Sequence, residues 1–464
     1  MPLPIEHNTS RATLLFQSRG IMSARELQEQ LGLSQPSVFR ILAALGSRIL
    51  RIGARRSARY ALRRNLGPLV GSQWPIYRID RMGKATLWAQ LTALHGGFLV
   101  VWSGADPRWL ESTYPDGLFS GLPFFLEELR PQGFLGRLTA QALTKSGGYS
   151  PDPRQWSQDD VLTFLLNEGD DLPGDLVVGE RMLERIQRRQ LEDSRAAVTH
   201  ADRAGRYPDL AESVTRGDAP GSSAGGEQPK FLASVMTADG VNPVLVKFSA
   251  PTSTPIGQRW ADLLLSEWHA LELLRAENIS ASKAEIFDAR GRRFLEVKRF
   301  DRVQSFGRHG VLSLSGVEAS MMDPSASSWI SASYGLEAAQ LLNPETAAQL
   351  RRLACFGELI ANNDMHLGNV GFWFGDHAPL DLAPVYDMLP MLLAPTIQGE
   401  LVHRDFTPRP PPPELLPDWT RACRWALEFW RRIRADDRFS PEFTAYAARW
   451  HDVVMRLRDR FAPS

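Results

Sequence analysis

The sequence predicts an α+β protein made of four successive domains. Three observations support this prediction. Short amphipathic helical segments fill the first 45 residues, strand-length apolar runs alternate with turn residues up to about residue 302, and amphipathic helical segments dominate the rest. We place the domains at residues 1–65, 66–150, 151–302 and 303–464.

The composition is that of an ordinary globular protein, with 43% hydrophobic residues and a formal net charge of zero. No apolar run approaches the roughly 20 residues that span a bilayer, so we expect no membrane partner. The N-terminus lacks the basic-then-apolar pattern of a secretory signal. Two isolated cysteines, Cys355 and Cys423, give neither a disulfide framework nor zinc-ligand spacing. We therefore expect a reduced, cytoplasmic protein.

The first domain has the pattern of a winged helix-turn-helix. Ser23 can cap a helix, ARELQEQL, with Glu26 as its capping-box partner, and Gly32 makes the following turn. Ser34 can cap the next helix, QPSVFRILAAL. RILRI and RYAL then alternate like two strands around a basic tip. Helix, short turn, helix and wing together predict this motif over residues 1–65.

Charge in the same region is strongly biased. No acidic residue lies between Glu29 and Asp80, whereas arginines are frequent there. Such a basic block favours a polyanionic partner, and with the motif it predicts DNA binding. The alternative is a small helical domain with a solvated basic face. The candidate DNA contacts are Gln35, Ser37, Arg40, Arg55, Arg56 and Arg59.

The centre of the chain is less informative. Residues 66–150 predict a small α+β domain without a catalytic motif of its own. Residues 152–195 predict helices, and residues 196–229, rich in Gly, Ser, Asp and Pro, predict a loop.

Four weak signals then follow, and their order is more informative than any one of them. GSSAGGEQPKF (221–231) is a small-residue loop of the kind whose backbone can approach a phosphate. The strand VNPVLVKFS carries Lys247, and an amphipathic helix at 256–279 carries Glu267 on an apolar stripe. A buried carboxylate needs a partner, so we expect Glu267 to pair with Lys247. With a further strand at 292–302 that ends in a charged turn, this is the order of a protein-kinase N-lobe, although the loop alone could equally be a flexible linker.

The segment NNDMHLGN (362–369) contains candidates for the catalytic base and for a metal ligand. A kinase catalytic loop places its base Asp five residues before an Asn that holds magnesium, and Asp364 precedes Asn369 by five. A later Asp is needed as the second oxygen ligand, and PVYDMLP provides Asp387. The alternative is a polar loop that merely caps a helix.

Together, GGEQPKF, LVKFS, SEWHALELL, VKRFDR, NNDMHLGN and PVYDMLP resemble the HipA-like serine/threonine kinases, the toxin kinases of bacterial toxin–antitoxin systems. The resemblance covers about residues 66–464. It implies a two-lobed protein-kinase-like fold with an added N-terminal subdomain, preceded here by the winged helix-turn-helix. It also implies ATP and Mg²⁺ as cofactors and a protein substrate phosphorylated on Ser or Thr, with a translation component as one candidate and an antitoxin protein as a candidate partner.

The resemblance also assigns residues by motif. Gly225, Gly226, Glu227, Gln228, Pro229 and Lys230 would form the ATP loop, and Lys298, Arg299 and Phe300 the adenine hinge. Lys247, paired with Glu267, would hold the phosphates. Asp364 would be catalytic, with Asn369 and Asp387 as the metal ligands. The rest of the nucleotide site would be His366, Leu367, Gly368 and Tyr386.

Family members carry a regulatory serine in the glycine loop, and its autophosphorylation switches the kinase off. Ser223 occupies the matching place, seven residues before Lys230, and Ser222 is adjacent. Phosphorylation there would add about two negative charges where the nucleotide phosphates must lie.

Two alternative functions compete with a protein kinase. A small-molecule kinase of the aminoglycoside or choline type shares the Asp-to-Asn spacing. A DNA-binding regulator with a non-catalytic kinase-like body is the other, but such a protein has no need to retain Lys247, Glu267, Asp364, Asn369 and Asp387 together. The fused N-terminal domain departs from the two-gene family pattern, in which the DNA-binding antitoxin is a separate protein.

Overall fold

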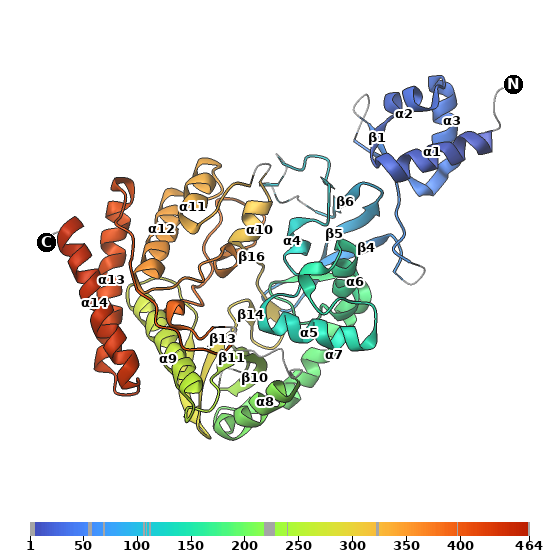
Figure 1. The fold of residues 1–464 in the computed structure, drawn as a ribbon. Helices are drawn as coiled ribbons and strands as arrows, with labels where there is room; N and C mark the ends of the chain where they lie inside the picture. The colour runs from blue at the N-terminus through green and yellow to red at the C-terminus, as the bar shows by residue number, and fades with distance from the viewer. Residues whose placement is uncertain are drawn as a thin grey trace.

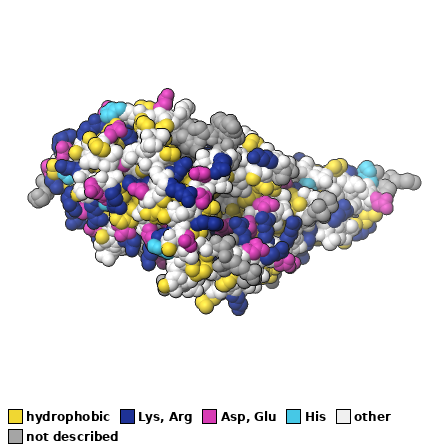
Figure 2. Space-filling view, turned by 90° about the horizontal axis from the view of Figure 1, so that it is seen from below, with side chains coloured by type: hydrophobic (Ala, Val, Ile, Leu, Met, Phe, Trp, Pro, Cys, Tyr) yellow, Lys and Arg dark blue, Asp and Glu magenta, His cyan; other side chains and the backbone are white. Residues whose placement is uncertain are grey.

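The computed structural model describes residues 5–53, 58–67, 70–104, 107, 109–110, 113–217, 228–238, 240–321, 324–396 and 398–462. Figure 1 shows the N-terminal helices at one end of the molecule and the helices α13 and α14 at the other. In the view from below, the outline narrows toward the N-terminal end, and side chains of both charges are interspersed over the face shown (Figure 2). A mixed surface of this kind agrees with the zero net charge.

The N-terminal domain consists of three helices and a small antiparallel sheet in the order β1-β3-β2. Ser23 and Glu26 form the expected capping box, and Gly32 ends α2 in the left-handed conformation. Ser34 occupies the N-cap of α3, but its hydroxyl makes no capping bond and lies 3.1 Å from the Ser37 hydroxyl instead. The elements are α1 (Ile5–Arg19), β1 (Met22–Ser23), α2 (Ala24–Leu31), α3 (Gln35–Leu45), β2 (Ile49–Ile52) and β3 (Arg59–Leu62).

The middle domain is a five-stranded antiparallel sheet, in the order β7-β6-β5-β4-β8, with helices packed on it. Its last strand, β8, pairs with β4, so this domain reaches beyond the boundary that the sequence suggested at residue 150. The elements are β4 (Gln73–Ile79), β5 (Ala85–Leu94), β6 (Gly97–Trp102), β7 (Leu118–Phe119), α4 (Phe124–Glu127), α5 (Gly133–Ser146), α6 (Gln158–Glu168), β8 (Leu176–Val178) and α7 (Glu180–Ala196).

The hairpin β2–β3 packs against the middle domain. Ile52 and Ala61 of the hairpin form one buried cluster with Leu94 and Leu99. The backbone of Gly20 passes so close to Gly96 that a side chain at either position would collide with the other. The N-terminal domain is therefore joined to its neighbour by packing as well as by the chain.

The N-lobe contains a five-stranded sheet in the order β12-β13-β11-β10-β9, with α8 and α9 beside it. Residues 203–217 form the helix α8, which contradicts the loop predicted for residues 196–229. Gly205 and Pro208 suggested a loop, but the buried side chains of Tyr207 and Ala211 pack against the sheet and stabilise the helix. The elements are β9 (Val198–Thr199), α8 (Arg203–Gly217), β10 (Lys230–Thr237), β11 (Gly240–Phe248), α9 (Pro255–Ala276), β12 (Ala284–Ala289) and β13 (Arg292–Lys298).

The C-lobe is mainly helical, as expected. One short antiparallel pair, β14–β15, lies between it and the N-lobe in the chain, and in a second pair β16, before α10, joins β17, after α12. Within the described residues, no helix is both long and apolar enough to cross a membrane. The elements are β14 (Arg302–Val303), β15 (Gly307–Arg308), β16 (Val311–Ser313), α10 (Leu314–Ala319), α11 (Trp329–Ala338), α12 (Pro344–Leu359), the 3₁₀ turn η4 (Leu367–Asn369), β17 (Gly371–Trp373), α13 (Leu416–Ala435) and α14 (Pro441–Phe461).

Candidate active site

A buried lysine and two carboxylates form the centre of the site. The Lys247 side chain, from β11, lies 2.7 Å from both carboxylate oxygens of Glu267 on α9, and it also contacts the carboxylate of Asp387. Lys247 is 4% exposed and Glu267 is 1% exposed. The pair predicted from the sequence is therefore present, and Asp387 joins it from 140 residues away.

The charges of these three groups depend on one another. Burial alone would lower the pKa of Lys247, but the carboxylates of Asp387 and Glu267 reverse this and raise it. Burial would raise the pKa of Asp387, but Lys247 and Lys230 lower it to about 2. The pKa of Glu267 is raised, because its burial outweighs the neighbouring lysine. Asp387 is therefore an anion at neutral pH.

The backbone at Asp387 is held in an unusual conformation. Its φ of 52° lies in the left-handed region, which residues other than glycine rarely adopt. The Asp387 N–H donates to Glu267 Oε1 at 3.2 Å, and the Asn362 side-chain amide donates to the Asp387 carbonyl at 3.3 Å. Strained residues of this kind persist where the surroundings hold them, commonly at functional sites.

The proposed catalytic loop is fastened by its own side chains. Asn362 accepts a hydrogen bond from the Asp364 N–H at 3.1 Å, and the Asn369 side chain donates to the Asp364 carbonyl at 2.8 Å. The Asn369 bond uses the amide nitrogen, which leaves the amide oxygen available as a ligand. Asp364 is exposed at the loop surface, where an acceptor hydroxyl can reach it.

Aromatic packing joins this loop to the hinge region. The Tyr386 hydroxyl donates to the Gly368 carbonyl at 2.8 Å, and the Tyr386 ring stacks on Phe300 at a centroid distance of 5.8 Å. His366 precedes the turn η4 and accepts the Gly368 N–H, and Leu367 opens that turn. Of these residues, Phe300, Gly368 and Tyr386 line a single cleft, which the N-lobe sheet and the middle domain also line.

The predicted hinge residues Lys298, Arg299 and Phe300 lie at the end of β13 and directly after it. Lys298 is exposed, whereas the guanidinium of Arg299 is occupied by Asp171 at 2.6 Å and Asp301 at 2.9 Å. Arg299 therefore fastens the hinge to the segment before β8, and its side chain is not free for a nucleotide.

Only the end of the ATP loop lies within the described residues. Gln228 donates to the Phe248 carbonyl at 2.5 Å, Pro229 follows, and Lys230 begins β10 directly opposite Lys247. Gly225, Gly226, Glu227, Ser222 and Ser223 lie outside the described residues.

A cleft of about 660 Å³ connects these groups. One wall consists of Leu232, Leu245 and Val297 of the N-lobe sheet, and Lys247, Glu267 and Asp387 lie within it. The opposite wall belongs to the middle domain, where residues 131–136 and the first turns of α5 line the cleft. The cleft therefore has a broad apolar surface and a charged end, which suits a nucleotide base and its phosphates.

Mg²⁺ prefers oxygen ligands, and the side chains of Asn369 and Asp387 both carry oxygen atoms. Among the described residues there is no group of three or more His, Cys, Asp or Glu side chains arranged for a metal. Mg²⁺ is commonly held by one or two carboxylates together with substrate phosphates, so a two-residue protein contribution is chemically sufficient.

The candidate DNA-binding residues are divided between two environments. On α3, Gln35 and Arg40 are exposed, and Arg40 donates to the partly exposed Ser37 at 3.1 Å. Arg59 on β3 forms an ion pair with Asp116 of the middle domain at 2.9 Å. Arg55 and Arg56 lie outside the described residues.

Three residues at the site were not singled out from the sequence. Asn362 stands in the quoted motif NNDMHLGN, and its place beside Asp364 was the only available signal. Trp329 donates from its indole nitrogen to the His366 carbonyl at 3.0 Å, and Asp171 binds Arg299. No sequence pattern indicated Trp329 or Asp171, because each lies far along the chain from the residue that it contacts.

Comparisons with known proteins show which family the chain belongs to. A family model described as "YjjJ-like toxin, middle domain" matches residues 70–187, and one described as "HipA-like C-terminal domain" matches residues 222–436. The protein "Toxin YjjJ" of Escherichia coli (strain K12) is 35% identical over 448 residues, which cover 96% of this chain and 97% of that protein.

A solved structure supports the fold. A chain of the Shewanella oneidensis MR-1 toxin–antitoxin complex of HipA, HipB and operator DNA aligns with a TM-score of 0.55 and 15% identity. The alignment covers 84% of this chain and 97% of that chain. At this identity the likeness concerns the fold alone, while the YjjJ toxin and the two family models establish the relationship. The chain therefore belongs to the HipA-like toxin kinases, in the family of the YjjJ toxin.

Proposed function

We propose that this protein is an ATP- and Mg²⁺-dependent serine/threonine protein kinase that also phosphorylates its own glycine loop. The observation that carries the proposal is the buried Lys247–Glu267 ion pair set directly against Asp387. A lysine paired with a helix glutamate, beside a metal-binding aspartate, is the arrangement that an active protein kinase requires. A non-catalytic body has no use for a buried ion pair beside a third, partly buried charge at this cost of desolvation.

Each residue then has a definite task. Lys247 would bind the nucleotide phosphates, and Asn369 and Asp387 would hold Mg²⁺, which supplies positive charge to the transferring phosphoryl group. Asp364 would accept the proton of the attacking Ser or Thr hydroxyl. The hydroxyl oxygen would form the bond to the γ-phosphorus while the bond from that phosphorus to ADP breaks. Glu267 and Asn362 would keep Lys247 and the two loops in position.

The acceptor is proposed as a protein hydroxyl, with Ser223 and Ser222 as acceptors within the chain and a translation component as one candidate outside it. Family membership supports this class. A small-molecule acceptor would require the same catalytic residues, so only an assay separates the two.

The test is incubation of the purified chain with Mg²⁺ and ATP labelled on the γ-phosphate, beside Asp364→Asn and a Ser222→Ala/Ser223→Ala double variant. The exposed Asp381→Asn serves as a matched control. We expect phosphoserine or phosphothreonine on the wild type and the control, none on Asp364→Asn, and less on the double serine variant. Label transferred only to added choline or an aminoglycoside would contradict the proposal, as would nucleotide binding without any transfer.

We also propose that the N-terminal domain binds DNA. The exposed polar face of α3, with Gln35, Ser37 and Arg40, supports this second function. The related S. oneidensis complex contains HipB and operator DNA beside HipA. In this chain residues 5–62 add three helices and a hairpin to the kinase-like body. Binding of DNA through this domain would not need a separate antitoxin.

A further inference from the structure

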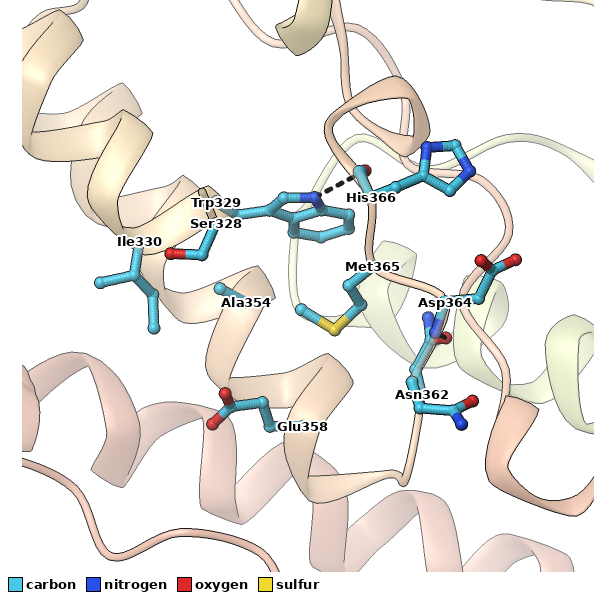
Figure 3. A pocket seen from close by; sticks show the side chains of 10 residues that line it. Ser328, Trp329, Ile330, Ala354, Glu358, Asn362, Asp364, Met365 and His366 are labelled. Atoms are coloured by element: carbon cyan, nitrogen blue, oxygen red, sulfur yellow. Dashed lines mark hydrogen bonds between the residues drawn. The ribbon is translucent and has the colours of Figure 1, made fainter. Parts of the chain in front are cut away.

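A second pocket, of about 350 Å³, opens beside the proposed catalytic loop. Its walls come from the first residues of α11, the C-terminal half of α12 and the loop of residues 362–366, as Figure 3 shows. Trp329 is 3% exposed and its bond to the His366 carbonyl fastens α11 to that loop. The pocket is therefore formed by elements that are already in contact, and we call it the acceptor-side pocket.

The lining of this pocket combines apolar side chains with acidic ones. Trp329, Ile330, Ala354 and Met365 provide apolar wall, and the Glu358 carboxylate lies at one end. The lining contains the carboxylates of Glu358 and Asp364 and no lysine or arginine. The described lining is thus apolar and acidic at once.

The Glu358 carboxylate lines this pocket without a bonded partner. Within the described part of the chain this carboxylate makes no hydrogen bond and no ion pair, although the backbone carbonyl of Glu358 accepts the Ala361 N–H at 3.1 Å. Glu358 is exposed to solvent, yet partial burial of its carboxyl against the pocket raises the pKa of this group, and the charge of Arg409 offsets only part of the rise. A carboxylate in this state is stabilised by a cation that enters the pocket.

A lysine or arginine side chain has the complementary shape. Its methylene stem packs on apolar surface while its charged end reaches a carboxylate. The volume is at the small end of the range for ligand pockets, which suits one long side chain better than a whole cofactor. In Figure 3 the side chains of Asp364 and Met365 leave the loop on opposite sides. Neighbouring side chains of an extended peptide also point to opposite sides, so one can reach Asp364 while the next enters the pocket.

We propose that the acceptor-side pocket binds a lysine or arginine that flanks the acceptor Ser or Thr of the protein substrate, and that Glu358 selects its positive charge. This inference rests on the proposed kinase function for the identity of the acceptor. The binding step itself requires no phosphoryl transfer, and the two can therefore be tested apart.

The test uses the full chain with Mg²⁺ and a non-hydrolysable ATP analogue. Fluorescent peptides carry one Ser in an alanine background, and each flanking position is occupied in turn by Lys, by uncharged norleucine or by Glu. Fluorescence anisotropy gives the dissociation constants. At one flanking position we expect Lys to bind about tenfold more tightly than norleucine, as for a charge-assisted hydrogen bond.

Variants of Glu358 identify the pocket. Glu358→Gln should reduce the Lys-to-norleucine ratio to near one, and Glu358→Lys should turn the preference toward the Glu peptide. Glu345→Gln removes an exposed carboxylate from the same helix, outside the pocket, and should keep the wild-type ratio. Equal binding of all peptides, no binding of any, or a Lys preference that survives Glu358→Gln would overturn the inference.

A parallel transfer assay with labelled ATP separates this inference from the proposed function. Charge-dependent binding without phosphate transfer would leave the pocket in place and remove the kinase function. Phosphate transfer without a charge preference in binding would support the kinase function and remove the proposed role of the pocket.

Discussion

At the scale of single residues, substitution of Lys247 should affect both stability and phosphoryl transfer. Lys247→Met leaves Glu267 buried without its cation, and breaking such a pair costs about 3–5 kcal/mol. We expect the free energy of unfolding to fall by about 3 kcal/mol at pH 8, together with loss of phosphoryl transfer. The loss of stability should be smaller at pH 5, because Glu267, whose pKa burial already raises, can then take up a proton. Urea unfolding at both pH values measures this.

The double variant Lys247→Met/Glu267→Gln is the control for that result. It removes both charges of the pair, so most of the stability at pH 8 should return while phosphoryl transfer stays absent. A single variant as stable as the wild type at pH 8 would mean that the pair is not buried as the structure has it.

Asn362 is predicted to act through its neighbours and not on the substrate. Its side chain holds the Asp387 carbonyl and the Asp364 N–H, so Asn362→Ala frees both loops at once. Residues that orient metal ligands typically change activity by about 10- to 100-fold, and we expect kcat to fall within that range. Nucleotide affinity should change little, since Lys247 and Glu267 are untouched. Steady-state kinetics and calorimetry together measure the split, and an equal loss in both would contradict a positioning role.

At the scale of elements, Glu128 joins the middle domain to α10. Its carboxylate, beside the end of α4, accepts the Ser313 N–H at the N-cap of α10, and its second oxygen is buried without a partner. Burial raises the pKa of Glu128 to about 7, from 4.5, although the bonds from Ser313 oppose the rise.

A raised carboxyl pKa means that the folded state binds the proton more tightly than the unfolded state. Stability should therefore fall as pH rises from about 4.5 to about 7, by up to about 3 kcal/mol from this group. Glu128→Gln keeps an acceptor for Ser313 and removes the charge. We expect the variant to be more stable than the wild type at pH 7.5 and similar to it at pH 4.5. Identical pH profiles for the two proteins would show that Glu128 does not titrate in this range.

The elements also show how far sequence can lead. Periodicity and capping residues predicted α2, α3, β11 and α9, because local signals such as the Ser23–Glu26 box act within one turn. The helix α8 was missed, since Pro208 and Gly205 argue locally against a helix that packing of Tyr207 stabilises. At the site, motif spacing predicted Lys247, Glu267 and Asp387. The bond between Arg299 and Asp171 had no such signal, because 128 residues separate the partners.

At the scale of the whole molecule, ion pairs join the middle domain to the segment after β13, the proposed hinge. Asp171 binds both Arg299 and Arg302 of that segment, beside the cleft proposed for the nucleotide. We expect Asp171→Asn to lower the free energy of unfolding by about 2 kcal/mol, because it weakens charge-assisted bonds to both Arg299 and Arg302 in a partly buried place, and to weaken nucleotide binding severalfold. Denaturant unfolding and calorimetry measure the two effects. Asp209→Asn removes an exposed pair with Arg290 and should change stability by under about 1 kcal/mol. Equal effects of the two substitutions would mean that the ion pairs of Asp171 contribute nothing special.

The packing of the N-terminal domain on the middle domain also bears on DNA binding. Arg40 is exposed on α3, whereas Arg59 is paired with Asp116, so the two arginines should differ in their effect on DNA affinity. We expect Arg40→Ala to weaken binding to a duplex and to reduce the slope of log affinity against log salt by about one if Arg40 contacts a phosphate. Asp116→Asn should strengthen binding severalfold, because it releases Arg59 and removes a negative charge beside it. Fluorescence anisotropy with a labelled duplex over a range of KCl concentrations measures both, and Arg25→Ala, an exposed arginine of α2 paired with Glu29, is the control. If neither substitution changes the affinity or its salt dependence, DNA is not the partner of this domain, and its basic face is simply solvated.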